Sequence, residues 1–334
     1  MGTICEMFLE REKATLSKQA FLTANTRGRD FPYVPSDMRT EFQRDRDRII
    51  HCQSFRRLMN KTQVFLAPTG DHYRTRLTHT LEVTQIARIL ARALGLNEDL
   101  TEAAALGHDL GHTPFGHSGE DAMQELFSPD FTHYKQSLRV VEKLENNGKG
   151  LNLTWEVRDG IVNHTGKHLA STLEGVLVKF ADRIAYINHD IDDACRGGIL
   201  CPEDIPKELR EILGETHSQR INTMVGSVIR ESTGQSEIRM SPDIQDATNR
   251  LRAFLFANVY TNSRAKAEEG KAKEMLAQLF DYFSAHPEQM PELYFQNVES
   301  EGVGRCVCDF ISGMTDRYAI ETYKKLFIPR VWSL

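Results

Sequence analysis

The stretch AAALGHDLGHTPFGHSGEDAM, residues 103–123, concentrates ionisable side chains directly behind an apolar run. It holds three histidines, at 108, 112 and 117, and three carboxylates, at 109, 120 and 121, in a chain with 12 histidines among 334 residues. The residues Ala103–Leu106 lead straight into His108 and Asp109, which predicts a buried approach to this pair. Because a buried charged group needs a partner or a metal ion, the stretch favours a metal or catalytic site over a solvated surface turn.

The segments around this stretch follow a helical period. In LTHTLEVTQIARILARALG, residues 77–95, leucine and isoleucine side chains share one broad stripe that stops at Gly95. Asn97 or Asp99 can cap the next helix, and Pro114 stands where another helix would begin. These patterns predict a helical surrounding for the histidine-rich stretch.

The second half of the chain also has a helical pattern. STLEGVLVKFADRIAYINHDIDDACRGG, residues 171–198, opens with Ser171 and Glu174 at capping-box spacing and closes on two glycines, which predicts one long helix. Further helices are expected at 203–213, 217–231, 243–262, 265–284 and 305–326, with one weak strand candidate at 235–240. The prediction is an all-α protein over 1–334, with a core at 60–200 and a C-terminal helical region at 201–334.

Charge and cysteine content exclude several classes of protein. The formal net charge of −6 gives no overall attraction for nucleic acid or an anionic membrane, so a polyanionic ligand must meet a local basic cluster. The Arg-rich segment at 43–57 is expected to pair Arg44, Arg46 and Arg48 with interleaved carboxylates. No apolar run approaches the roughly 20 residues of a membrane span. The six cysteines form no CxxC pair, which predicts free thiols in a reducing, cytoplasmic compartment.

Two further residues change the interpretation of the His108–Asp109 pair. His79 lies within the first amphipathic helix and Asp182 within the long helix, and each alone is most simply an ordinary core or surface residue. Together they give the order His, His-Asp, Asp on separate helices. In this order the chain resembles the HD superfamily of metal-dependent phosphohydrolases, whose fold is helical.

The resemblance extends over longer motifs. Six segments look like the deoxyguanosinetriphosphate triphosphohydrolase family in its shorter, bacterial-type branch, and they cover residues 36–200 densely and in order. They are SDMRTEFQRDRDRIIHCQSFRRLMNKTQVF (36–65), RTRLTHTLEV (74–83), HDLGHTPFGHSGE (108–120), FTHYKQSLRV (131–140), WEVRDGIVNHTG (155–166) and ADRIAYINHDIDDA (181–194). After residue 200 only the helical character and the ending ETYKKLFIPRVW are similar.

The resemblance implies a metal site and a catalytic pair. The matched metal ligands are His79, His108, Asp109 and Asp182. Imidazoles and carboxylates without a thiolate suit a divalent Mn, Mg, Co, Ni or Fe ion better than zinc.

The family's catalytic histidine and its carboxylate partner match His117 and Glu120. Since they are three residues apart at a helix start, Glu120 is expected to accept the proton of one His117 ring nitrogen. His112 and His133 match histidines around the triphosphate, although a structural role at a helix start explains His133 equally well.

The resemblance also implies how a deoxynucleoside triphosphate is held. Arg76, three residues before His79 on the same helix face, can reach a phosphate, whereas Arg183 points about 100° away from Asp182. By resemblance Tyr186 packs on the sugar, and Asp190 and Gln63 bind its 3'-hydroxyl. The plainer alternative for Tyr186 is a packing tyrosine on an amphipathic helix.

The expected activity is therefore hydrolysis of dGTP or another dNTP to a deoxynucleoside and triphosphate. The resemblance implies a homo-oligomer, often a hexamer, and leaves room for single-stranded nucleic acid or an allosteric nucleotide as a further ligand. One alternative is an HD nucleotidase or phosphodiesterase, which needs the four ligands but not His117 and Glu120. Another is a nucleotide-sensing or single-strand-binding HD protein without turnover, which the intact GHSGE segment (116–120) argues against.

Overall fold

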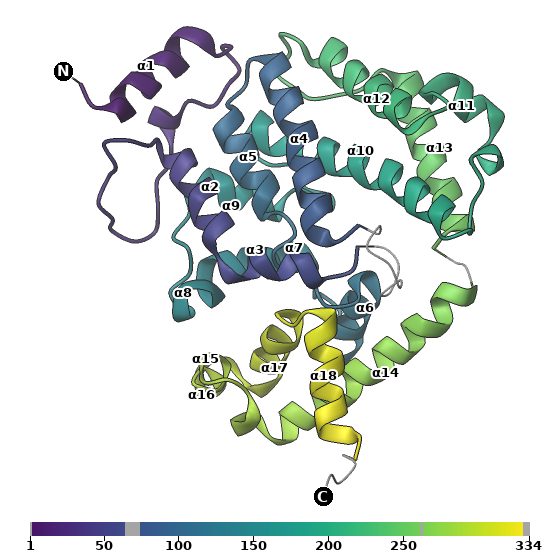
Figure 1. Cartoon of the computed structure of the whole chain (residues 1–334). Coiled ribbons are helices and arrows are strands. Elements are labelled where there is room, and N and C mark those ends of the chain that lie inside the picture. Colours follow the sequence, from purple (N-terminus) through teal and green to yellow (C-terminus); the bar gives the residue numbers. More distant parts are fainter. Residues whose placement is uncertain (1, 64–73, 261–262, 330–334) are drawn as a thin grey trace, which may run out of the picture. The chain divides into compact units, whose positions relative to one another are not determined.

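The computed structural model describes residues 2–63, 74–260 and 263–329 (Figure 1). Over these residues the secondary structure is helical, and the only strand-like pairing is an isolated bridge between Thr62 and Thr75. The all-α prediction is confirmed. The strand candidate at 235–240 is wrong, because this segment bonds locally: the Ser232 hydroxyl donates to Arg239 O at 3.2 Å and accepts from Arg239 N at 3.0 Å.

The chain divides into two compact units, each assembled from separate segments. The first unit comprises residues 1–51, 78–108 and 152–262. The second comprises residues 52–77, 109–151 and 263–334. Because segments from before and after residue 200 enter both units, the expected division into 60–200 and 201–334 stays a prediction.

Helix α10 is central to the first unit and packs against α5, α9, α12 and α13 (Figure 1). The close approach of α9 to α5 requires glycine at position 160, because an added Cβ there would lie 2.8 Å from the Ala104 side chain on α5. The helices of this unit are α1 (Ile4–Thr15), α2 (Glu41–His51), α4 (Arg76–Leu94, whose first two residues count with the second unit), α5 (Glu98–Gly107), α9 (Trp155–Val162), α10 (Leu173–Arg196), α11 (Lys207–Leu213), α12 (His217–Ser232) and α13 (Pro242–Asn258), with 3-10 turns Thr23–Asn25 and Pro202–Asp204.

The start of α10 differs from the expected capping box. Thr172, not Ser171, is the N-cap, and its hydroxyl accepts from Gly175 N at 3.1 Å. The carboxylate of Glu174 accepts from the backbone N–H groups of Phe21 and Asn97, each at 2.9 Å. It therefore ties distant loops to α10 instead of capping its own helix. The predicted cap at Asn97 is confirmed by its bond from Leu100 N at 3.2 Å.

The second unit is built on an apolar core between α6, α14 and α17. Met123, Leu276, Leu279, Val307 and Ile311 are each fully buried in it. The helices of this unit are α3 (Gln53–Arg57), α6 (Gly116–Leu126), α7 (His133–Arg139), α8 (Glu145–Gly148), α14 (Ser263–Ala285), α15 (Glu292–Phe295), α16 (Val298–Glu301), α17 (Val303–Ser312) and α18 (Asp316–Phe327), with a π-helical turn Val140–Leu144 and 3-10 turns Leu58–Asn60 and Pro287–Gln289.

Most predicted helices after residue 200 are present with shifted ends. The segment 203–213 becomes a 3-10 turn followed by α11, because Pro206 interrupts it. The segment 305–326 divides into α17 and α18, because Thr315 caps a new helix. Positions 261–262 of the predicted helix 243–262 lie outside the described residues. No helix in the described part of the chain is long and apolar enough to cross a membrane.

Candidate active site

Three helices of the first unit bring two imidazoles to one carboxylate. His79 lies on α4, His108 directly follows α5, and Asp182 lies on α10. The His79 Nε2 atom is 3.2 Å from Asp182 Oδ1, and the His108 Nε2 atom is 4.0 Å from the same oxygen. The structure therefore brings together three of the four predicted metal ligands within one unit.

The hydrogen bond of the His108 ring suits metal binding. His108 Nδ1 lies 2.7 Å from Ala105 O, so Nδ1 carries the proton and Nε2 presents its lone pair toward Asp182. His164, which sequence analysis does not assign, packs edge-on against His108 with ring centres 4.9 Å apart. Although burial alone raises the pKa of Asp182, the bond to His79 and the nearby His108 and His164 lower it overall. The carboxylate is thus held ready as an anionic ligand.

The donor set fits a divalent ion. The buried imidazoles of His79 and His108 converge on the Asp182 carboxylate, and no thiolate is among these donors. The fourth candidate ligand, Asp109, is the next residue after His108 in the sequence. Hard and borderline ions such as Mg and Mn bind such oxygen and nitrogen donors.

Asp190 lies two turns beyond Asp182 on α10 and is buried with a tyrosine partner. The Tyr260 hydroxyl donates to Asp190 Oδ2, and among the described residues Oδ1 of Asp190 has no hydrogen-bond partner. Burial raises the pKa of Asp190 to about 7 and raises that of Tyr260 as well. Tyr186 lies between Asp182 and Asp190 on this stripe, half-buried, as its spacing predicts. Sequence analysis missed Tyr260, because it is 70 residues from Asp190 and sits in no motif.

In the second unit, the remaining candidate residues surround the turn between residue 109 and α6. The Arg76 guanidinium is 2.8 Å from Asp109 Oδ2, and Arg76 is only 2 % exposed. The rings of His112 and His133 stack with centres 4.4 Å apart and planes inclined by 15°. Gln63 is buried, and in the described part of the chain its side-chain oxygen has no partner.

Glu120 does not hold His117 as expected. Its carboxylate accepts from His133 N at 2.9 Å and lies 2.9 Å from His133 Nδ1, so it fixes the second of the two stacked rings. The reason is that α7 starts at His133 and points its free backbone N–H and its ring toward Glu120. His117 stands exposed on the first turn of α6, and its ring centre is 6.1 Å from that of His112.

The pKa shifts separate these histidines. Burial and the positive charge of Arg76 lower the pKa of His112 well below its usual value. The pKa of His117 is lowered as well, by the protein atoms packed around its ring and by Arg76, although part of the side chain is open to solvent. Burial alone would lower the pKa of His133, but the Glu120 carboxylate raises it overall. His133 is therefore the ring of the group that protonates most readily, whereas the lowered pKa values of His112 and His117 favour their neutral forms.

A second metal position at Asp109, His112 and His133 is disfavoured by geometry. One potential ligand atom from each of these residues lies within 4.8 Å of the others. A bound ion must lie along the lone pair of each ring nitrogen, in the ring plane, and two rings stacked at 4.4 Å cannot share such an ion without turning. The stacked pair, with Arg76, better fits an anionic ligand.

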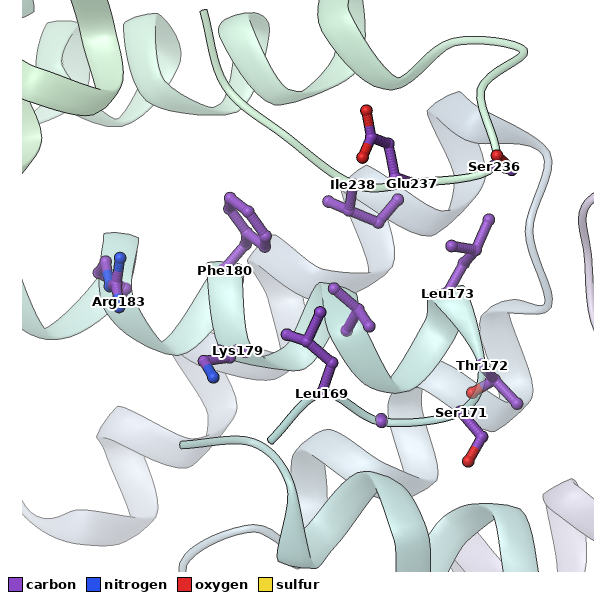
Figure 2. A pocket seen from close by; sticks show the side chains of 12 residues that line it. Leu169, Ser171, Thr172, Leu173, Lys179, Phe180, Arg183, Ser236, Glu237 and Ile238 are labelled. Carbon is purple, nitrogen blue, oxygen red and sulfur yellow. The ribbon is translucent and has the colours of Figure 1, made fainter. Parts of the chain in front are cut away.

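A separate pocket of about 440 Å³ lies in the first unit along α10 (Figure 2). Leu173 and Phe180 line it, and they project roughly 160–180° around the helix from Asp182. Arg183 also lines this pocket, which agrees with its predicted turn away from Asp182. The pocket is therefore on the opposite face of α10 from the candidate metal ligands.

The helical fold and the His-Asp constellation define an HD-type phosphohydrolase. The model of the HD domain matches residues 76–187, and that of the phosphohydrolase-associated domain matches residues 238–325. A crystal structure of a phosphohydrolase from Bacteroides thetaiotaomicron shares the fold, with a TM-score of 0.53 and 19% identity over 84% of this chain and 67% of that one.

The chain belongs to the deoxyguanosinetriphosphate triphosphohydrolase-like family. A protein of that name from Caldanaerobacter subterraneus is 58% identical over 98% of this chain and 96% of its own. A second, from Desulfatibacillum aliphaticivorans, is 49% identical over 98% of this chain and 99% of its own. The resemblance stated from the motifs is confirmed.

Proposed function

We propose that this protein is a metal-dependent dNTP triphosphohydrolase that cleaves dGTP or another dNTP to a deoxynucleoside and intact triphosphate. The observation that carries the proposal is the convergence of the His79 and His108 nitrogens on Asp182, in a chain whose relatives bear the triphosphohydrolase-like name. A hydrolase of the HD class needs this ligand set for any phosphate ester.

The divalent ion, Mn, Mg, Co, Ni or Fe, is held by His79, His108, Asp109 and Asp182 in this proposal. When bound, it polarises a phosphate oxygen and favours attack at the adjacent phosphorus.

The chain's own residues bind the triphosphate and transfer the proton. Arg76 and the protonated ring of His133 offset the charge of the triphosphate, and the neutral ring of His112 donates or accepts one hydrogen bond. His117, neutral and exposed, moves the proton at the reacting oxygen. Glu120 favours the protonated form of His133 and orients its ring instead of acting on His117.

The roles proposed for binding the sugar are those that the family resemblance implies. Tyr186 packs on the deoxyribose, and Asp190 and Gln63 bind the 3'-hydroxyl. Oδ1 of Asp190 and the side-chain oxygen of Gln63, which have no hydrogen-bond partner among the described residues, support this role, because a buried acceptor needs a donor and the hydroxyl can donate to one of them.

The single-strand-binding alternative is less well supported. Arg44 pairs with Glu41 at 3.4 Å, and Arg46 pairs with Glu102 at 3.3 Å, so these arginines offer little net positive charge to a phosphate backbone. From the family resemblance we further propose a cytoplasmic homo-oligomer, with a hexamer as the expected form.

Product analysis tests the proposed reaction. The purified protein is incubated with Mn and each dNTP in turn, alone and in pairs, and the products are separated by ion-exchange chromatography. We expect deoxynucleoside and triphosphate in equal amounts. Release of dNMP with pyrophosphate, or of phosphate alone, would support the nucleotidase or phosphodiesterase alternative and reject ours.

Substitutions should separate metal binding from chemistry. His79→Ala or Asp182→Ala removes a ligand, so bound metal and activity should be lost together. His117→Ala should keep its metal and lose kcat by about 100-fold or more, the usual contribution of a proton-transferring group. Elemental analysis beside steady-state kinetics checks both, and a metal-free His117→Ala protein would contradict the division.

A further inference from the structure

The turn that leads into α6 has an unusual backbone. Phe115 has φ 63° and ψ 27°, the left-handed region, and Gly116 follows with φ 58°. A residue with a side chain rarely adopts this conformation unless its surroundings impose it. The turn carries His112 at its start and His117 at its end, so its backbone sets the direction of both rings.

A single carboxylate from the C-terminal part of the chain binds this turn. Asp316, in the first turn of α18, is 7 % exposed, and its Oδ1 atom accepts from Phe115 N at 3.0 Å. Its Oδ2 atom accepts from Thr62 N at 2.9 Å and also from the Thr62 hydroxyl. Asp316 therefore joins the left-handed residue to the segment that contains Gln63.

A buried lysine makes the matching connection at the other end of the turn. The ammonium of Lys61, a residue only 2 % exposed, donates to His112 O and to Ser312 O, the latter at 2.8 Å. Ser312 ends α17, four residues before Asp316. Both ends of the turn at 112–115 are thus bound to the junction of α17 and α18.

We propose that Asp316 is a positioning residue: by accepting the Phe115 N–H it holds the turn so that His117 and His112 face the reacting phosphate. The effect on catalysis rests on the proposed function, whereas the hold on the turn does not. This assigns a role to the C-terminal helical region, which contributes no residue of the HD motif.

Packing alone does not account for this contact. The ring of Phe115 is already buried in the core of the second unit, which anchors the side chain but leaves the backbone N–H free to turn. A carboxylate that accepts two backbone N–H groups is a charge-assisted acceptor with a defined direction. Asp316 therefore orients the peptide group of Phe115, whereas the apolar core fixes only the position of its side chain.

The experiment compares Asp316→Ala with Thr315→Ala. Thr315 is the adjacent residue and caps α18 through its bond from Tyr318 N at 3.1 Å, but its side chain does not bind the turn at 112–115. Both substitutions weaken the start of α18, so thermal unfolding shows how much stability each loses. Hydrogen–deuterium exchange of the peptide covering 110–118, elemental analysis and steady-state kinetics are measured on both.

Asp316→Ala should speed amide exchange at residues 113 and 115–117 and lower kcat about tenfold or more, with bound metal retained and KM changed less than kcat. Thr315→Ala should leave exchange and kcat as in the unmodified protein, despite its lower melting temperature. Asp316→Asn, which keeps one acceptor oxygen, should recover part of kcat. Unchanged exchange in Asp316→Ala, or equal losses of kcat in both alanine variants, would overturn the proposal.

If the unmodified protein hydrolyses no dNTP, the proposed function fails, and the exchange data still decide whether Asp316 holds the turn.

Discussion

At the scale of single residues, environment assigns different charges to groups that look alike in sequence. His112, His117 and His133 are imidazoles in two neighbouring family motifs, yet of the three only His133 has a raised pKa, because Glu120 faces it. Asp182 and Asp190 lie on one stripe of α10. The pKa of Asp182 is lowered by neighbouring imidazoles, while burial raises that of Asp190 to about 7. One carboxyl suits a metal, and the other suits a hydroxyl.

Asp190 should make stability depend on pH in a specific window. Its pKa is about 7 in the folded protein and near the ordinary aspartate value of 3.8 when unfolded, so the folded state binds the proton more tightly. The resulting stabilisation is complete below pH 4 and is lost as pH rises through 7. We expect Asp190→Asn, which mimics the protonated acid, to be about as stable as the unmodified protein at pH 4.

At pH 8 the same variant should be the more stable of the two, by at most about 4 kcal/mol, since three pH units correspond to that free energy. Urea unfolding of both proteins at pH 4, 6 and 8 measures the difference. A difference that is constant across this range would show that folding does not raise the pKa of Asp190.

At the scale of helices, the ends are decided by which side chain is free to cap. Ser171 and Glu174 have the spacing of a capping box, but Glu174 binds Phe21 N and Asn97 N, and α10 starts one residue later at the Thr172 cap. The sequence pattern does mark a helix start. Because the Glu174 carboxylate binds distant backbone N–H groups, however, it does not complete a capping box with Ser171.

Thr172→Ala should therefore destabilise the protein by about 1 kcal/mol, the usual cost of losing an N-cap hydroxyl. Ser171→Ala is the matched control, because Ser171 is exposed and should change stability by less than about 0.5 kcal/mol. Thermal unfolding of both variants gives the comparison. A larger loss for Ser171→Ala would restore the capping box that the sequence suggests.

At the scale of the whole molecule, the two units divide the candidate residues between them. His79, His108, Asp182, Tyr186 and Asp190 belong to the first unit. The residues of the second unit are Gln63, Arg76, Asp109, His112, His117, Glu120 and His133. The C-terminal helices complete the core of the second unit, so their stability bears on the residues proposed for chemistry.

Leu276 on α14 tests that core. Leu276→Ala should lower the free energy of unfolding by about 2–5 kcal/mol, because the side chain is fully buried and leaves a cavity. Lys271→Ala on the same helix is the control and should cost less than about 0.5 kcal/mol, since Lys271 is exposed. Denaturant unfolding measures both, and similar losses would mean that α14 does not support the core through Leu276.

Much of the fold and of the candidate site is predictable from the sequence, for identifiable reasons. Helical period predicts α4, α10 and α12, and Asn97 predicts the start of α5, because these signals are local. The division of 305–326 into α17 and α18 also has a local signal, the Thr315 cap, which periodicity alone overlooks. The family motifs identify the metal-ligand candidates and place Tyr186 and Asp190 on one stripe of α10.

The sequence by itself determined an all-α HD-type chain, its family, and the residues that can carry chemistry. The reason is that helical periodicity and sequence motifs depend on residues close together along the chain. Only the tertiary structure decided which groups pair. It joined Glu120 to His133, Tyr260 to Asp190 and Asp316 to Phe115, the last across 201 residues. A buried polar group takes whichever partner packing brings within about 3 Å, and spacing along the chain carries no information about that distance.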